Sequence, residues 1–332
     1  MVTTGLTALI IVILFALIFD FLNGFHDAAN SIATIVSTRV LKPHWAVIWA
    51  AFFNFIAFLF FHGEVATMVG TGLVNPSIID IKIIFAAVFG AIIWDIVTWY
   101  FGLPTSSSHA LVGGLVGAAI AKSGFHFLEW NGIIKVVVSI FLSPLMGFIL
   151  AIILMIIVYR IFFAVYRHRA ENLFKKLQFV SAALFSLGHG GNDAQKTMGI
   201  IAVLLFTSGH LGPKFYIPFW VVITCNFVMG LGTLFGGWRI VKTMGMRITK
   251  LKPVQGFCAE TTAAATLFLA NYLGIPVSTT HTIAGSIAGV GLIRKVRGVR
   301  WNVAEKIVWA WIFTIPAAAI LSGIVWELVR KL

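Results

Sequence analysis

The chain has 332 residues, of which 60% are hydrophobic and only 11% are charged, and its mean hydropathy is +0.99. A soluble domain does not need that much apolar surface, whereas a bundle of helices that faces lipid does. The formal net charge of +13 comes from clusters of Lys and Arg between apolar spans, a pattern typical of one side of a membrane rather than of a nucleic-acid-binding surface.

Apolar spans with almost no charge follow one another along the first half of the chain, at 6–19, 46–61, 83–94 and 136–159. Inside a bilayer every backbone polar group must be hydrogen-bonded within the protein, and these spans show no barrel-type alternation, so they predict helices. The first span lacks a basic lead-in and a small-residue cleavage site, which favours a retained helix over a signal peptide.

Two polar motifs and one asparagine occur twice at a nearly constant spacing, which indicates a duplication. The matching segments are 23–31 with 189–197, 102–109 with 274–281, and Asn54 with Asn226. We therefore divide the chain into a first membrane repeat, 1–165, and a second, 166–332. Polar islands that recur in a duplicated membrane protein predict a substrate site between the two repeats.

The basic clusters determine the expected topology. They are Arg39 with Lys42, Arg160 to Lys176, Arg239 to Lys252, and Arg294 to Lys306. Placing all four in the cytoplasm makes each half cross the membrane an odd number of times and leaves both termini extracytoplasmic. An odd number of crossings inverts the second repeat relative to the first.

Two segments, 2–41 and 171–208, must each make one net crossing, yet they are too long for a single span at about 1.5 Å per residue. Both carry glycine near the middle, at Gly24 and at Gly190–Gly191, so we expect either a helix that breaks there or a helix followed by a re-entrant hairpin. The predicted fold is an all-α integral membrane protein: an inverted-topology repeat transporter of about twelve helical segments, with broken helices at the midplane.

Asp27 and Asp193 are carboxylates at membrane depth, which normally mark an ion site or a proton relay. Amide oxygens of the kind that suit a hard cation occur in the same motifs, and His26 next to Asp27 can titrate near neutral pH. The expected cation or proton site comprises Asp27, Asn30, Asp193, His26, Asn54 and Asn226, with sodium, if bound, at Asp27 and Asp193. The alternative is that Asp and Asn beside Gly are ordinary helix caps.

Pro104 and Pro276 each interrupt an apolar segment and are followed at once by hydroxyl side chains. Proline followed by Ser or Thr predicts a helix start, where free N–H groups and hydroxyls can bind an oxyanion. The expected anion ligands are Ser106, Ser107, Ser108, Ser278, Thr279, Thr280, Lys196 and Asn192. The alternatives are plain capping for the hydroxyls and a snorkelling side chain for Lys196.

The sequence does not assign a single role to several other polar residues. His109 and His281 could donate to an anion, relay protons or orient the hydroxyls, and Asp95 and Glu260 have no counterpart in the other repeat. Small residues after the two predicted helix starts would allow close helix packing; these are Gly113, Gly114, Gly117, Gly285 and Gly289.

The two Gly-x-x-Asp motifs, Gly24 to Asn30 and Gly191 to Lys196, resemble the signature of the inorganic phosphate transporter (PiT) family, and the two Pro-x-Ser-x-x-His elements match it as well. The resemblance implies phosphate bound at the midplane between the repeats and cations beside Asp27 and Asp193. His26 is similar to the bacterial proton-linked variant, whereas sodium-linked members more often have Asn at that position. The family also includes sulfate permeases, so sulfate is the alternative substrate.

We therefore expect a multi-pass protein of the inner (plasma) membrane that imports inorganic phosphate, free or as a metal-phosphate complex, together with H⁺ or Na⁺, the proton being favoured. No cofactor is expected, and a homodimer is one candidate assembly. The rival from another class is an intramembrane hydrolase, because Ser, His and Asp share the polar islands. The chain has no Gly-x-Ser-x-Gly elbow, and its Ser/His pairs occur in both halves, so we do not expect an enzyme.

Overall fold

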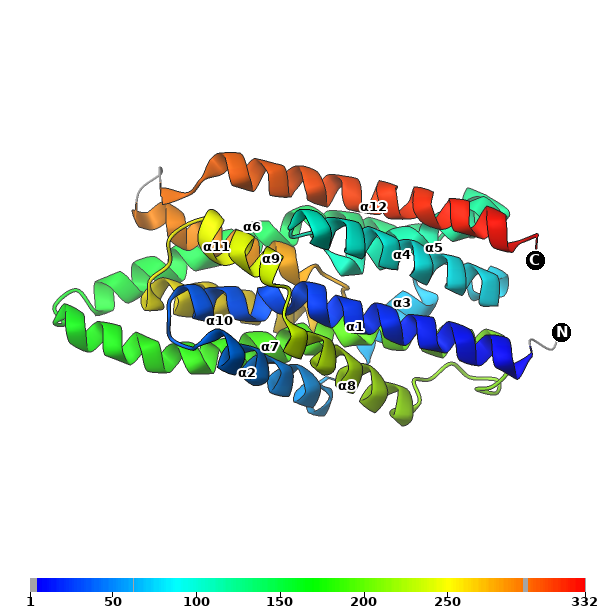
Figure 1. Ribbon diagram of the computed structural model, residues 1–332, viewed down its shortest axis with the longest axis horizontal. Coiled ribbons are helices and arrows are strands. Elements are labelled where there is room, and N and C mark those ends of the chain that lie inside the picture. The colour runs from blue at the N-terminus through cyan, green and yellow to red at the C-terminus, as the bar shows by residue number, and fades with distance from the viewer. Residues whose placement is uncertain (1–4, 62, 295–297, 332) are drawn as a thin grey trace.

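The computed structural model describes residues 5–61, 63–294 and 298–331, so Lys295 and Arg297 of the fourth basic cluster lie outside the described residues. The described part of the chain forms twelve α-helices and no named strand (Figure 1). The helices are α1 Leu6–Ser37, α2 Pro43–Ile56, α3 Glu64–Thr71, α4 Ile81–Phe101, α5 Ser107–Ser123, α6 Trp130–Ile161, α7 Arg167–Thr207, α8 Phe219–Phe235, α9 Trp238–Lys242, α10 Pro253–Tyr272, α11 Thr279–Arg294 and α12 Trp301–Val329.

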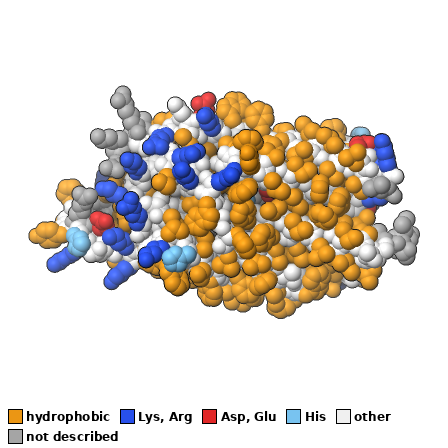
Figure 2. Space-filling model, in the orientation of Figure 1, with side chains coloured by type: hydrophobic (Ala, Val, Ile, Leu, Met, Phe, Trp, Pro, Cys, Tyr) orange, Lys and Arg blue, Asp and Glu red, His pale blue; other side chains and the backbone are white. Residues whose placement is uncertain are grey.

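Four of these helices, α1, α4, α6 and α12, are long and apolar enough to cross a membrane. Two bent pairs raise the number of candidate spans among the described residues to as many as six. In one pair α2, with its short continuation to Leu59, meets α3 at 81°, and in the other α8 meets the 238–247 segment at 62°. Most of the exposed side chains on the middle of the molecule are hydrophobic (Figure 2), as lipid contact requires.

The two proline-containing motifs start helices as predicted. α4 ends at Gly102, whose φ of +64° is a left-handed conformation that glycine adopts without strain, and Gly274 has the same value after α10. α5 then begins behind the N-cap Ser106, whose hydroxyl accepts the N–H of His109 at 3.2 Å. The N–H of His281 donates to Ser278 in the same way at 3.1 Å, where α11 begins.

The predicted helix breaks at Gly24 and at Gly190–Gly191 are wrong. α1 continues through 32 residues and α7 through 41, so each glycine lies inside an unbroken helix. A Cβ on Gly24 would lie 2.1 Å from the carbonyl oxygen of Met229 on α8, and one on Gly190 would lie 2.4 Å from that of Asn54 on α2. The glycines are needed because another backbone packs directly against them, not because the helix changes direction.

The excess length of α7 is accommodated at its N-terminal end. Its first turns, including Arg169, Lys175 and Lys176, are exposed and charged, so only the later part of the helix runs through the apolar body. The length argument for a broken helix fails here because the helix extends beyond the apolar part of the molecule.

Close packing by small residues is confirmed on both helices that follow the proline motifs. A Cβ on Gly117 of α5 would lie 2.2 Å from the carbonyl oxygen of Ala319 on α12, and one on Gly285 of α11 would lie 2.1 Å from that of Pro144 on α6. α5 of the first half therefore packs on α12 of the second, and α11 of the second packs on α6 of the first. The two halves exchange partners and form one interlocked body.

Candidate functional site

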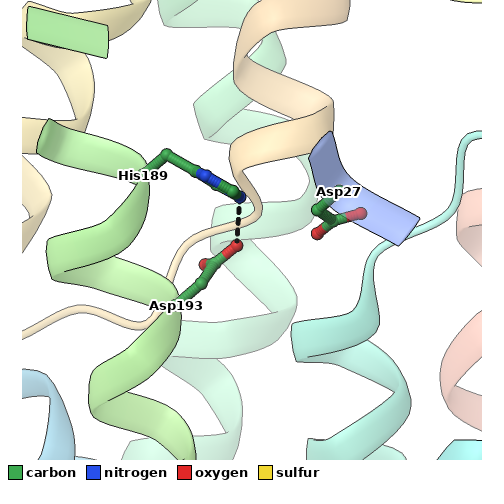
Figure 3. Close-up of side chains that lie close together, drawn as sticks. All are labelled: Asp27, His189 and Asp193. Atoms are coloured by element: carbon green, nitrogen blue, oxygen red, sulfur yellow. Dashed lines mark ion pairs between the residues drawn. The ribbon is translucent and has the colours of Figure 1, made fainter. Parts of the chain in front are cut away.

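The site lies where α1 and α7 pass the beginnings of α5 and α11, and its side chains are almost completely buried. Asp27 comes from α1 and Asp193 from α7, the positions matched by the duplication. One ligand atom each from Asp27, Asp193 and His189 lies within 4.8 Å of the others (Figure 3). The predicted convergence of the two carboxylates is therefore present.

Lys196 is held inside this cluster and does not snorkel to the surface. Its side chain is 1% exposed, and its ammonium group forms an ion pair with Asp193. It also donates to the hydroxyl of Ser108 and, at 2.9 Å, to the carbonyl oxygen of Val277 just before α11. One buried cation thus links α7 to both helix starts.

The hydroxyls at the start of α11 contact both carboxylates. Thr279 donates to Oδ2 of Asp193 at 2.9 Å, and Thr280 donates to Oδ1 of Asp27 at 3.4 Å. The side-chain amide of Asn30 donates to these same two hydroxyls at 3.2 and 2.9 Å. On α5, Ser108 reaches Asp193 at 3.4 Å, while the Ser107 hydroxyl lies near Asp95 on α4.

His26 connects Asp27 to α4. Its Nδ1 lies 2.9 Å from Oδ1 of Asp27, and its Nε2 lies 3.1 Å from the hydroxyl of Thr98. The same Thr98 hydroxyl also lies 3.0 and 3.2 Å from the carbonyl oxygens of Trp94 and Asp95. Both ring nitrogens of His26 are thus within hydrogen-bond distance of a partner, one on its own helix and one on α4.

His189 contacts Asp193 on α7 from a position that is not equivalent to that of His26, four residues before the aspartate. Its Nε2 lies 3.2 Å from Oδ2 of Asp193, and its Nδ1 lies 3.2 Å from the amide oxygen of Asn54 and 3.3 Å from the hydroxyl of Ser31. Asn54 in turn donates to Thr233 at 2.9 Å. Two carboxylates and one imidazole are a donor set that could hold one cation.

Some residues expected in the site lie outside this hydrogen-bonded cluster. Asn192 donates to Asn271 at 2.9 Å, and Asn226 donates to the carbonyl oxygen of Val222 on its own helix at 2.9 Å. Ser106 and Ser278 cap α5 and α11, so their hydroxyl oxygens already accept one backbone N–H each.

The expected site did not include four contacting residues: His189, Ser31, Thr98 and Asn271. His189 and Ser31 lie within the two copies of the duplicated motif, so the motif itself could have indicated them. Thr98 and Asn271 lie outside both motifs and reach His26 and Asn192 only because separate helices pack together.

Comparison with known proteins decides the family. Residues 23–322 match the model of the "Phosphate transporter family". The chain belongs to this family. The resemblance drawn from the motifs is thereby confirmed, and because the family is one of transporters, the chain is a multi-pass membrane protein and not a hydrolase.

Close relatives share this assignment over nearly their whole length. A protein of Rhizobium meliloti (strain 1021), named "Probable low-affinity inorganic phosphate transporter", is 62% identical over 97% of this chain and 96% of its own. A protein of Bacillus subtilis (strain 168) with the same name is 44% identical over 97% of both chains. A solved structure described as "The sodium-dependent phosphate transporter" has a TM-score of 0.90 at 24% identity and covers 98% of this chain and all of that one, a likeness of fold.

Proposed function

We propose that the protein imports inorganic phosphate by proton-coupled symport with alternating access. The observation that carries this proposal is the convergence of two helix starts, α5 and α11, on Asp27, Asp193 and Lys196. The first N–H groups of each helix have no acceptor within it, and the helix dipole gives that end a partial positive charge, so both ends favour an oxyanion. The names of the Rhizobium and Bacillus relatives support phosphate as that anion.

In this proposal the anion would contact the hydroxyls of Ser107, Ser108, Thr279 and Thr280 together with the ammonium group of Lys196. Ser107 and Ser108 come from one half of the chain and Thr279 and Thr280 from the other. An anion bound at this place would bridge the two repeats, which is how a repeat transporter binds its substrate.

The charge of the cluster supports symport. The buried cluster has two carboxyl groups, those of Asp27 and Asp193, and one ammonium group, that of Lys196, so acidic groups are in excess over the lysine. Adding a phosphate anion without a cation would increase that excess in a medium that solvates charge poorly. A co-bound cation or proton removes this cost, and uptake then depends on the gradient of that ion.

The contacts of His26 favour the proton. His26 is within hydrogen-bond distance of both Asp27 and Thr98, so a proton taken up here can be shared between the imidazole and the carboxylate. An imidazole can change protonation state near neutral pH, where a proton-coupled carrier must load and release its proton. Sodium symport is the second candidate, favoured by the cluster of Asp27, His189 and Asp193 and by the description of the structural neighbour.

We further propose that 1–165 and 166–332 are inverted repeats in the inner membrane, with both termini extracytoplasmic. Support comes from the exchange of partners between α5–α12 and α11–α6. Lys and Arg side chains gather at the end of the molecule opposite both termini (Figures 1 and 2), and basic loops remain in the cytoplasm.

Uptake by proteoliposomes tests the proposed substrate. Purified protein in sealed vesicles with an alkaline interior is expected to accumulate labelled phosphate in a saturable manner, and empty vesicles serve as the control. Sulfate offered at the same concentration is expected to be taken up far more slowly. Transport of sulfate without phosphate would refute the substrate and leave the fold and the family unaffected.

Alanine at Ser107, Ser108, Thr279 or Thr280 is expected to raise the apparent KM for phosphate. Loss of one buried hydrogen bond costs about 1–3 kcal/mol, which corresponds to roughly five- to 150-fold weaker binding. Thr282→Ala is the matched control, because the Thr282 hydroxyl is equally buried on α11 but donates to the carbonyl oxygen of Ser278 in its own helix. An unchanged KM in all four variants would mean that these hydroxyls only cap helices.

A further inference from the structure

We propose that a pocket between the ends of α6, α7 and α10, at the basic end of the molecule, binds one anionic phospholipid. The pocket has a volume of about 420 Å³ and is formed by the last turn of α6, the 162–165 connection, the first turns of α7 and the start of α10. It shares no residue with the candidate transport site, which lies on later turns of α7.

The walls of the pocket suit an acyl chain. Val158, Phe162 and Phe174 line it, and the rings of Phe162 and Phe174 meet edge to face with their centroids 5.1 Å apart. Phe174 is only 2% exposed and also packs on Phe257 at 5.4 Å, so this wall is fixed by the core. Phe163 lines the same pocket and is 91% exposed. Exposure of so large an apolar side chain to water is unfavourable, and contact with a lipid would remove it from water.

The rim of the pocket suits a phosphate headgroup. Lys252 lines the pocket and is exposed. The exposed Arg160 follows the lining residue Tyr159 in the sequence, and the exposed Arg169 precedes the lining residue Ala170. The acidic lining residue Glu171 lies 3.7 Å from the ammonium group of Lys175. The pocket thus has a basic lining residue, Lys252, and further basic residues next to it along the chain.

The position of the pocket favours a lipid over a soluble anion. Arg160 lies in the last turn of α6, where the helix leaves its apolar span, and aromatic residues surround the connection to α7. Aromatic and basic residues together mark the headgroup level of a membrane. A free phosphate ion would gain nothing from the aromatic walls, and a zwitterionic lipid would gain little from the basic rim, so an anionic phospholipid fits best.

Native mass spectrometry of the purified protein tests this proposal, with phosphatidylglycerol and phosphatidylcholine offered separately. We expect the protein to retain phosphatidylglycerol preferentially. Lys252→Gln is expected to lower that retention about fivefold, because one lysine near an anionic headgroup changes the binding constant by about this factor. Ala170→Trp, which fills the pocket, is expected to abolish the preference.

Ile153→Trp is the matched control, because Ile153 is an exposed residue of α6 outside the pocket. Size-exclusion chromatography identifies any variant that does not fold, and Lys252→Gln, at an exposed position, remains informative if Ala170→Trp fails. Equal retention of the two lipids by the parent protein would refute the proposal. So would displacement of phosphatidylglycerol by millimolar inorganic phosphate, or unchanged retention by folded Lys252→Gln.

Discussion

Replacing Asp193 with asparagine is expected to abolish most phosphate uptake. The substitution keeps the shape of the side chain but leaves the buried ammonium group of Lys196 without its ion-pair partner. Breaking a buried ion pair by removing one member costs about 3–5 kcal/mol of stability. The position of the Lys196 ammonium group is then no longer fixed, and we expect the rate of uptake to fall roughly a hundredfold or more. The hydrogen bond from Thr279 and the contact with His189 are weakened at the same time. The measurement is the initial rate of uptake by proteoliposomes.

Asp20→Asn is the matched control for this variant. Asp20 is also a fully buried carboxylate on the seam between α1 and α7, but its hydrogen-bond partner is Thr197, outside the cluster. We expect Asp20→Asn to retain most activity. Uptake by a correctly folded Asp193→Asn protein at the parent rate would mean that the residue has a structural role only.

Uptake driven by a pH gradient is expected to be lost when His26 is replaced with asparagine. An amide can still contact Thr98 and Asp27, but it cannot take up a proton near neutral pH. The parent protein should accumulate phosphate in sodium-free buffer when the vesicle interior is alkaline, because protons then flow inward with the anion. In the variant the rate of this pH-driven uptake should fall at least tenfold. Exchange of phosphate across the membrane with the same pH on both sides should decline less.

His126→Asn provides the comparison, since His126 is exposed on a surface turn away from the site. The same vesicles are then tested with an inward sodium gradient at uniform pH. If the parent protein responds only to sodium, proton coupling is wrong, and Asp27, His189 and Asp193 become the candidate sodium ligands. If His26→Asn keeps full pH-driven uptake, the proton is carried elsewhere.

The sequence alone was sufficient for the local features of the site. Proline followed by Ser and Thr predicted the starts of α5 and α11, because capping depends on residues next to one another in the chain. The duplication predicted that Asp27 and Asp193 would be equivalent, and the composition predicted a helical membrane protein. The small residues of α5 and α11 likewise predicted close helix packing, since only side-chain size decides how near two backbones can approach.

Tertiary structure decided the features that depend on which helices meet. Gly24 and Gly190 suggested broken helices, but both lie in continuous helices, where they allow α8 and α2 to approach closely. A local sequence pattern cannot distinguish a glycine that bends a helix from one that makes room for a neighbouring helix. For the same reason the partners of His26 and Asn192, which are Thr98 and Asn271, could not be read from the motifs. A hydrogen bond between distant segments depends on the packing of the whole bundle, and that packing appears only in three dimensions.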